Sequence, residues 1–348
     1  MQDVLKQDFE YIRDHIVGIN KFRNASIMIT GGTGLIGSLL TRFFLFLNSV
    51  SNYNVTLYVV IRDQDKANRV FNDCSKRNLH YIVTDLENGN LNVEGNIDYI
   101  IHTAAITKSK LLISKPVDVI KLSANGTEQV LDLAVQKEVK SVVYLSSMEV
   151  YGQLALNRKI REKDLGTIDL SDPRSCYPES KRICECMCNA YAHQYDLDVK
   201  IARLAQTFGA GVLSSENRVF AQFARSIMAG KNIVLHTTGQ SEGNYVYTAD
   251  ALTALLVLLL KGKKGQSYNI VNESNHSTIK NMALEVTKYF GTPEQKVVID
   301  IPDEDMGYAP DVHMHLSNEK LRSLGWKPSV GLIEMYNRMI KWMQYDKE

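Results

Sequence analysis

The hydrophobic positions of this chain form short β-prone runs that alternate with longer helical stretches. The β-prone runs cover residues 26–29, 54–62, 79–84, 97–103 and 141–146, and helical patterns cover residues 38–46 and 125–137. Strands separated by helices predict an α/β fold with a doubly wound parallel sheet. Because ligands of such sheets bind beyond the carboxyl ends of the strands, we expect the functional residues there.

The organisation of the chain follows from the same pattern and from its length. Residues 1–24 carry an apolar stripe at helical spacing, so we expect an N-terminal helical extension that packs on the outside of the next domain. We expect residues 25–205 to form the dinucleotide-binding domain. Residues 206–348 should form mainly a smaller, interleaved substrate-binding lobe, with some segments returning to the first domain, because 348 residues exceed one typical core.

Composition excludes several classes of function. Hydrophobic residues make up 45% of the chain, charged residues 23%, and the net charge is +1, which gives no case for nucleic-acid binding. The longest apolar run, residues 255–260, is too short to cross a bilayer, and charges throughout residues 1–20 do not fit a signal peptide. Five cysteines, an odd number, favour a cytoplasmic location with free thiols.

Glycines lie between the first predicted strand and the helix that follows it. Gly31, Gly34 and Gly37 give one spacing and Gly32, Gly34 and Gly37 a second. Strand, glycine turn and helix together are typical of a Rossmann dinucleotide site, where the helix start offers N–H groups to the pyrophosphate. The turn and the helix start therefore predict cofactor contacts from Gly31, Thr33, Gly34, Leu35, Ile36 and Gly37.

The end of the second predicted strand bears on the choice of cofactor. An arginine at this position accommodates a 2′-phosphate, and an acidic residue binds the ribose 2′-hydroxyl. Arg62 occupies it, which favours NADP slightly, and Asp63 follows directly, which leaves NAD as the alternative.

Tyr177 and Lys181 are four residues apart at the start of a predicted helix, so their side chains share one face. A tyrosine serves as general base or acid only when its pKa falls from about 10, and a nearby ammonium and a positive nicotinamide favour the phenolate. Upstream, Ser147 and Glu149 follow the fifth predicted strand. The Ser147 hydroxyl could share the substrate proton with Tyr177.

The chain resembles the extended short-chain dehydrogenase/reductase family, in particular its NAD(P)-dependent nucleotide-sugar epimerases and dehydratases. The resemblance rests on the glycine turn, on residues 102–105, 146–152 and 203–209, on Asn125 to Thr127, and on Tyr177 with Lys181. It implies that Asp85 and Leu86 lie near the adenine and that Ala104 and Ala105 line the cofactor. It also implies a catalytic triad of Ser147, Tyr177 and Lys181, and a homodimer.

Several positions depart from the family pattern. Glu149 keeps a carboxylate that could remove a proton next to a ketone, but Met148 replaces the acid that dehydration requires, and a thioether donates no proton. Gln206 stands where the family usually has a substrate-contacting asparagine. Gly243 and residues 307–311 lack the arginines that the family places on a diphosphate. Arg218 is a candidate substitute for them, so we predict substrate contacts from Ser147, Met148, Gln206 and Arg218.

A run of three cysteines at alternate positions, Cys184, Cys186 and Cys188, is the one candidate for a metal cluster. On a helix, Cys184 and Cys188 share a face and Cys186 points elsewhere, so we interpret the run as core packing and predict no metal site.

We conclude that the sequence predicts an enzyme that acts on a nucleotide-activated sugar by hydride transfer at a hydroxyl or keto carbon, with NADP or NAD. The leading hypothesis is an epimerase or dehydratase that recycles its hydride. One alternative is an NADPH-dependent reductase of a nucleotide-linked keto-sugar, giving a deoxy-sugar or sugar alcohol. A second alternative is a non-catalytic protein that senses the dinucleotide.

Overall fold

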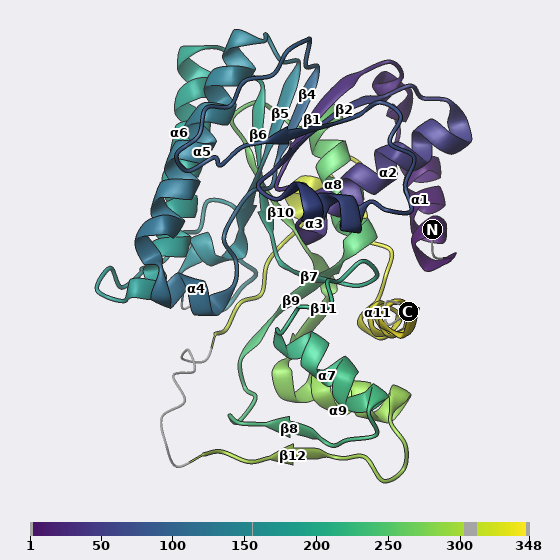
Figure 1. Ribbon diagram of the computed structural model, residues 1–348. Coiled ribbons are helices and arrows are strands. Elements are labelled where there is room, and N and C mark those ends of the chain that lie inside the picture. The colour runs from purple at the N-terminus through teal and green to yellow at the C-terminus, as the bar shows by residue number, and fades with distance from the viewer. Residues whose placement is uncertain (1–2, 155, 303–311, 346–348) are drawn as a thin grey trace.

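Seven parallel strands form the central sheet of the protein (Figure 1). The computed structural model describes residues 3–154, 156–302 and 312–345. The strand order is β10-β6-β5-β4-β1-β2-β3, so the chain changes direction across the sheet between β1 and β4. The predicted doubly wound parallel sheet is confirmed. The strands are β1 (Ser26–Thr30), β2 (Thr56–Ile61), β3 (Leu79–Val83), β4 (Tyr99–His102), β5 (Ser141–Ser147), β6 (Val199–Leu204) and β10 (Ser267–Ile270).

Helices cover both faces of this sheet because its strands are apolar on both sides. In β1, Ile27 and Ile29 point into one hydrophobic core and Met28 into the other. The first core contains α2 (Leu35–Ser51) and α8 (Thr248–Lys261), and the second contains α5 (Pro116–Gln136) and α6 (Cys176–Gln194). The two pairs of helices lie on opposite sides of the sheet in Figure 1.

The N-terminal segment forms helix α1 (Asp3–His15) and a short 3-10 helix, Ile19–Phe22. Its apolar stripe is buried as predicted, and the ring of Phe9 packs 5.7 Å from that of Phe43 in α2. Helix α1 also contacts α8 and α11 (Leu332–Tyr345), so it bridges the N-terminal and C-terminal parts of the chain.

A smaller lobe lies beyond the carboxyl ends of the central strands (Figure 1). Strands β7 (Gln206–Phe208), β9 (Glu242–Tyr247) and β11 (Asn272–Thr278) form one small sheet, and β8 (Ile233–Leu235) pairs with β12 (Val297–Ile299). Helices α7 (Val219–Met228) and α9 (Ile279–Phe290) pack in this lobe. Helix α8 and strand β10 interrupt it by returning to the central sheet.

Short elements connect these parts. They are α3 (Gln64–Val70), α4 (Ser109–Ser114), α10 (Glu319–Arg322) and the 3-10 helices η2 (Met148–Tyr151) and η3 (Pro173–Ser175). Among the described residues, no helix combines the length and the apolar character that a membrane crossing requires.

The structure corrects two predicted boundaries. Helix α5 begins at Pro116, nine residues before the predicted start at Asn125. Proline suits the first helical position, because the N–H that it lacks would have no partner inside the helix there. Helix α2 extends from Leu35 to Ser51, beyond the predicted 38–46, and the residue after it, Asn52, has a left-handed backbone conformation that ends the helix.

Candidate active site

The carboxyl ends of β1 and β4 meet where the strand order reverses, and this point is the expected position of a ligand. Gly31 has φ of +66°, and a Cβ atom there would lie 2.9 Å from the backbone N and Cα of Ala104. The Thr30 hydroxyl accepts hydrogen bonds from the backbone N–H groups of Thr103 and Ala104. Two segments predicted to line the cofactor, Gly31 and Ala104, are therefore in contact.

The start of α2 is shaped for an anion. Gly34 occupies the N-cap position of α2 and has no side chain that could accept a hydrogen bond. The first N–H groups of the helix, those of Leu35 and Ile36, are therefore not capped by it. A Cβ on Gly37 would lie 2.3 Å from the carbonyl oxygen of Gly31, so the turn approaches the helix as closely as glycine allows. These residues fit a dinucleotide pyrophosphate.

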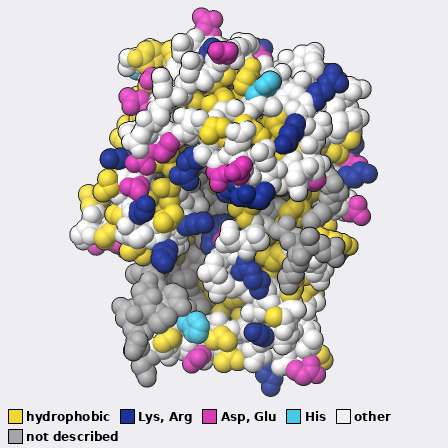
Figure 2. All heavy atoms as spheres, in the orientation of Figure 1, with side chains coloured by type: hydrophobic (Ala, Val, Ile, Leu, Met, Phe, Trp, Pro, Cys, Tyr) yellow, Lys and Arg dark blue, Asp and Glu magenta, His cyan; other side chains and the backbone are white. Residues whose placement is uncertain are grey.

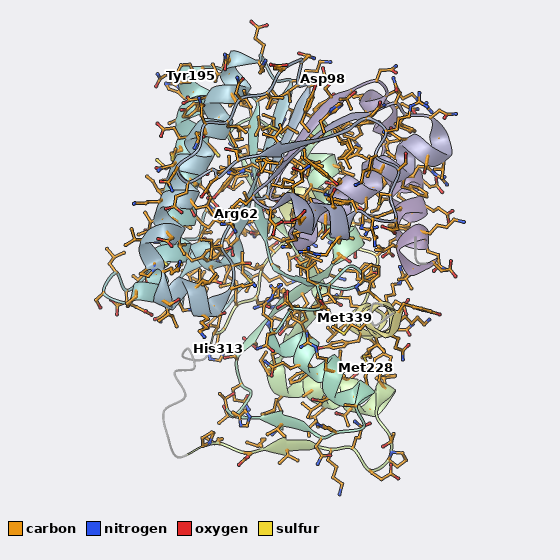
Figure 3. All side chains as sticks on the ribbon, viewed as in Figure 1. Arg62, Asp98, Tyr195, Met228, His313 and Met339 are labelled. Atoms are coloured by element: carbon orange, nitrogen blue, oxygen red, sulfur yellow. The ribbon has the colours of Figure 1, made fainter. Side chains whose placement is uncertain are left out.

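Arg62, predicted to contact the cofactor, follows β2 and is exposed. Figure 3 places it at the end of the central sheet that faces the smaller lobe, whereas Asp98, just before β4, lies at the opposite end. Asp63 caps α3 by accepting a hydrogen bond from the backbone N–H of Lys66 at 2.8 Å. Burial and the charges of Lys108 and Arg62 lower the pKa of Lys66, which shows that these three cations lie close together.

Asp85 and Leu86 follow β3 but differ in exposure. Asp85 is exposed and accepts a hydrogen bond from the backbone N–H of Glu87. Leu86 is buried, and its Cβ lies 3.2 Å from the position that a Cβ on Gly126 in α5 would take. The Leu86 side chain thus packs against α5, and Asp85 is the exposed member of the pair.

His102 belongs to the motif of residues 102–105, but the sequence predicts no role for it. Burial lowers its pKa to about 3, so the ring is neutral, and its Nδ1 lies 2.6 Å from the Thr30 hydroxyl. Its Nε2 lies 3.3 Å from the Thr127 hydroxyl of α5. His102 therefore joins β1, β4 and α5 beneath the crevice, and its place at the carboxyl end of a strand was the available signal.

Ser147, Tyr177 and Lys181 come together at the end of β5 and the start of α6. All three are buried, and the Ser147 hydroxyl lies close enough to the Tyr177 phenol to lower its pKa. Lys181 Nζ donates to the carbonyl of Leu145 at 2.7 Å and lies 5.9 Å from the centre of the Tyr177 ring. The predicted helical spacing places the phenol and the ammonium on one face, as expected.

The electrostatics of this group differ from the sequence expectation in one respect. Burial, and then the Glu149 charge, raise the pKa of Tyr177 to about 12, although the nearby Ser147 hydroxyl and the Arg218 and Arg174 charges oppose them. Burial lowers the pKa of Lys181 to about 8. The pKa of Tyr177 is therefore raised in this structure, opposite to the fall that the sequence predicts.

Glu149 lies beside this group and is ion-paired. Its Oε2 accepts a hydrogen bond from Arg174 Nη1 at 2.9 Å, and its backbone N–H donates to the Ser147 hydroxyl at 3.2 Å. Arg174 belongs to η3, directly before α6. Arg174 is not predictable from the sequence, because no local pattern of residues indicates a contact with Glu149, 25 positions away.

The predicted substrate residues occupy different parts of the site. Met148 packs against the first hydrophobic core, and Gln206 begins β7. Arg218 precedes α7, pairs with Glu216 at 2.7 Å, and lies close enough to Tyr177 to affect its pKa. In the space-filling view, Lys and Arg side chains gather near the middle of the face, above the smaller lobe (Figure 2). Residues 307–311 lie outside the described residues.

The cysteines of α6 follow the packing interpretation. Cys184 and Cys188 are buried and Cys186 is exposed. Within the described ranges, no three His, Cys, Asp or Glu side chains are grouped as metal ligands.

A glycine turn at the switch point of a doubly wound sheet, with a buried Ser-Tyr-Lys group at the next strand end, defines a dinucleotide-dependent enzyme of the short-chain dehydrogenase/reductase class. The sequence profile of the NAD dependent epimerase/dehydratase family matches residues 27–271, and the chain belongs to this family. The expectations of an enzyme and of a nicotinamide dinucleotide cofactor are confirmed. The preference for NADP stays a prediction.

Relatives and solved structures agree with this assignment. UDP-glucuronic acid decarboxylase 1 of Xenopus tropicalis is 28% identical over 323 residues, which cover 92% of this chain and 73% of the relative. The dTDP-D-glucose 4,6-dehydratase of Mus musculus is 26% identical over 332 residues, covering 91% and 88%. The crystal structure of UDP-glucose 4-epimerase from Thermotoga maritima superposes with a TM-score of 0.76 at 20% identity, covering 93% and 100%.

Proposed function

We propose that this chain modifies a nucleotide-linked sugar by removing hydride from one ring carbon and returning it, without net consumption of cofactor. The observation that carries this proposal is the burial of Ser147, Tyr177 and Lys181 in one group, with the Lys181 ammonium 5.9 Å from the centre of the Tyr177 ring. The relatives named above act on UDP-glucuronic acid and dTDP-D-glucose, which supports a nucleoside-diphosphate sugar as the substrate class.

The residues divide the proton chemistry between them. Bound NAD supplies a hydride acceptor and donor. Tyr177 takes the proton of the sugar hydroxyl as the carbonyl forms, and gives it back when the hydroxyl is restored. The Ser147 hydroxyl acts beside the phenol and lowers its pKa. A positively charged Lys181, 5.9 Å from the centre of the Tyr177 ring, favours the phenolate.

The middle step distinguishes the possible products. Glu149 has a carboxylate two residues from Ser147 and can remove a proton from the carbon beside the ketone. Epimerisation needs only that this proton be removed and replaced, whereas dehydration also needs an acid for the departing hydroxyl. Because the Met148 thioether cannot donate a proton, the residues favour epimerisation over dehydration.

The test is incubation of the purified protein with a panel of UDP- and dTDP-sugars, with NAD or NADP, followed by mass spectrometry and NMR. Epimerisation gives a product of unchanged mass in water and one deuterium at the inverted carbon in D2O, with no net absorbance change at 340 nm. Tyr177→Phe should lower kcat by about 100-fold or more. Stoichiometric oxidation of NADPH would contradict the proposal and support a reductase.

The reductase remains the second candidate because one observation favours it. Arg62, Lys66 and Lys108 lie close together beyond β2, where a 2′-phosphate would bind. Reductive enzymes use NADPH, so a measured preference for NADPH in binding would strengthen this candidate, provided that the cofactor is consumed with the substrate.

We also propose a homodimer and keep the cytoplasmic location as a prediction. Val117 and Ile120 of α5 and Ile183 of α6 are exposed apolar side chains on helices that pack together. A second copy that covered these side chains would remove them from water. Ile120→Glu with Ile183→Glu should give a monomer in sedimentation, while Leu284→Glu, an equally exposed position on α9, should leave the dimer intact.

A further inference from the structure

Glu185, Arg203 and Ser146 form a buried polar network directly behind the proposed catalytic residues. Arg203 donates to the Glu185 carboxylate from Nη2 at 2.6 Å and from Nε at 2.9 Å. Ser146 Oγ donates to the same carboxylate at 2.5 Å. The side chains of Arg203 and Glu185 are only 6% and 9% exposed, so loss of either one would leave the other charged and unpaired away from water.

The network extends to two further elements. Arg203 Nη1 donates to the Tyr151 hydroxyl at 3.1 Å and to the carbonyl of Glu162 at 2.6 Å. The Tyr151 hydroxyl donates to Asn269 Oδ1 at 2.6 Å. Hydrogen bonds thus connect side chains of β5, α6, η2, β6 and β10 in one network, with the Glu185 carboxylate and the Arg203 guanidinium at its centre.

Two of the proposed catalytic residues, Ser147 and Lys181, lie near a member of this network along the chain. Ser146 directly precedes Ser147 in β5, and Glu185 lies one helical turn after Lys181 in α6. A hydrogen bond from Ser146 to Glu185 therefore fixes the strand that carries Ser147 to the helix that carries Lys181. The hydrogen bond from Lys181 Nζ to the carbonyl of Leu145 is a second link between this strand and this helix.

We propose that Glu185 is a positioning residue of the active site, whose carboxylate holds the end of β5 against α6 and so sets the distance between Ser147 and Lys181. The role rests on the proposed function, since these are the residues that move the substrate proton. A shift of a few tenths of an ångström between hydroxyl and ammonium would misplace the sugar hydroxyl against Tyr177.

Glu185 also acts on Lys181 through its charge. Lys181 is fully buried, which lowers its pKa to about 8, and Cys184, Glu185 and Cys188, of which Glu185 is the carboxylate, oppose this shift. The other groups that face the ammonium are His102 of β4, Tyr144 of β5, and Tyr177, Cys184 and Cys188 of α6. Burial keeps His102, both tyrosines and Cys188 neutral near pH 8, and the Cys184 thiol donates to the carbonyl of Ser123. Among these groups Glu185 supplies the full negative charge.

The test compares Glu185→Gln with Asp8→Asn. Asp8 is the matched control because its carboxylate is also buried and paired with an arginine and a tyrosine, Arg338 and Tyr247, but lies on α1. Glu185→Gln should lower kcat by about 10-fold or more while KM for the sugar changes by less than about 3-fold. It should also shift the alkaline limb of kcat to lower pH, because Lys181 loses its proton more readily. Asp8→Asn should leave kcat and the limb unchanged.

A second readout does not depend on turnover. Competitive labelling of lysines with acetic anhydride across pH, quantified by mass spectrometry, gives the midpoint at which Lys181 becomes reactive. This midpoint should fall in Glu185→Gln and stay constant in Asp8→Asn. If no sugar nucleotide is converted by the wild type, the proposed function fails, and the labelling still reports on Glu185 and Lys181.

Ser146→Ala provides the variant that keeps the ion pair, and it applies if Glu185→Gln does not fold. It removes the bond between β5 and α6 only, so kcat should fall several-fold with the labelling midpoint unchanged. A folded Glu185→Gln with wild-type kcat and midpoint would overturn the role. So would Ser146→Ala with wild-type kcat.

Discussion

Arg174 Nη1 and Glu149 Oε2 lie 2.9 Å apart and form an ion pair at the side of the Tyr177 phenol. The side chains are 35% and 29% exposed, so water and substrate can reach both. The two charges act on the phenol in opposite directions, since Glu149 raises the pKa of Tyr177 and Arg174 lowers it. The pair therefore couples Glu149, which would remove a carbon-bound proton, to Tyr177, which would move the proton of the hydroxyl.

Substituting the two members of this pair should shift the pH profile in opposite directions. Glu149→Gln removes a charge that raises the pKa of Tyr177, so the pH at which hydride leaves the sugar in a single turnover should fall, and Arg174→Met should raise it. Glu149→Gln should also abolish product formation while the single-turnover reduction of NAD at 340 nm persists. Arg158→Met, which breaks the Arg158–Asp164 pair nearer the surface, serves as the control. Shifts of the same sign would contradict the coupling.

The cations beyond β2 should select between the two dinucleotides. Charge-assisted hydrogen bonds to a phosphate contribute about 1.5–3 kcal/mol, so Arg62→Ala with Lys66→Ala should weaken NADP binding by about 10- to 100-fold. NAD has no 2′-phosphate, and its affinity should change by less than about 3-fold. Isothermal titration calorimetry measures both, and Lys137→Ala, directly after the far end of α5, is the control for the loss of a distant positive charge. An equal loss for NAD and NADP would show that the cluster does not bind a 2′-phosphate.

Gly243 offers a gain-of-function test of the substrate lobe. It lies in β9 and pairs with Ser277 of β11. No atom beyond its chain neighbours lies within 4 Å of the position that a Cβ on Gly243 would take. Gly243→Arg should therefore fold normally and tighten binding of UDP or dTDP by about 10-fold, because a guanidinium can reach a diphosphate. Gly331→Arg adds the same charge at an equally open position before α11. Equal effects of the two variants, or none from Gly243→Arg, would contradict a diphosphate site at β9.

Local patterns predicted the parts of the site that depend on a few consecutive residues. The turn from Gly31 to Gly37 and the helical spacing of Tyr177 and Lys181 are both local, and the structure places them as expected. The doubly wound parallel sheet followed from the alternation of β-prone and helical runs, but the order of its strands did not. Residues 307–311, one of the departures from the family pattern, are not among the described residues.

Contacts between distant segments were not predictable, because they depend on where side chains point after folding. Arg174 and Glu149 are 25 positions apart, Arg203 and Glu185 are 18 apart, and Asp8 and Arg338 are 330 apart. A single sequence states neither the register between strands nor the rotamers that bring such groups within hydrogen-bonding distance. The early start of α5 was missed for a related reason, because Pro116 acts both as a helix start and as an apparent break.

Asp8 should make the stability of the protein depend on pH in an unusual direction. It is 2% exposed, and burial raises its pKa to about 6 even though Tyr247 and Arg338 donate hydrogen bonds to it. An unfolded aspartate has a pKa of about 3.9, so between pH 4 and pH 6 the folded chain binds a proton that the unfolded chain does not. The contribution of Asp8 to the free energy of unfolding therefore falls as the pH rises through this window.

Urea unfolding of the wild type and of Asp8→Asn, followed by circular dichroism at pH 4.5, 5.5, 6.5 and 7.5, measures this contribution, because other titrating groups cancel in the difference. The wild type should lose on the order of 2 kcal/mol relative to Asp8→Asn between the lowest and highest pH. Asp14→Asn removes an exposed carboxylate from the same helix and should show no such loss. A difference that stayed flat, or that grew in favour of the wild type with rising pH, would mean that Arg338 and Tyr247 outweigh burial. Asp8 would then be an ionised member of the contact between α1, β9 and α11 throughout this range.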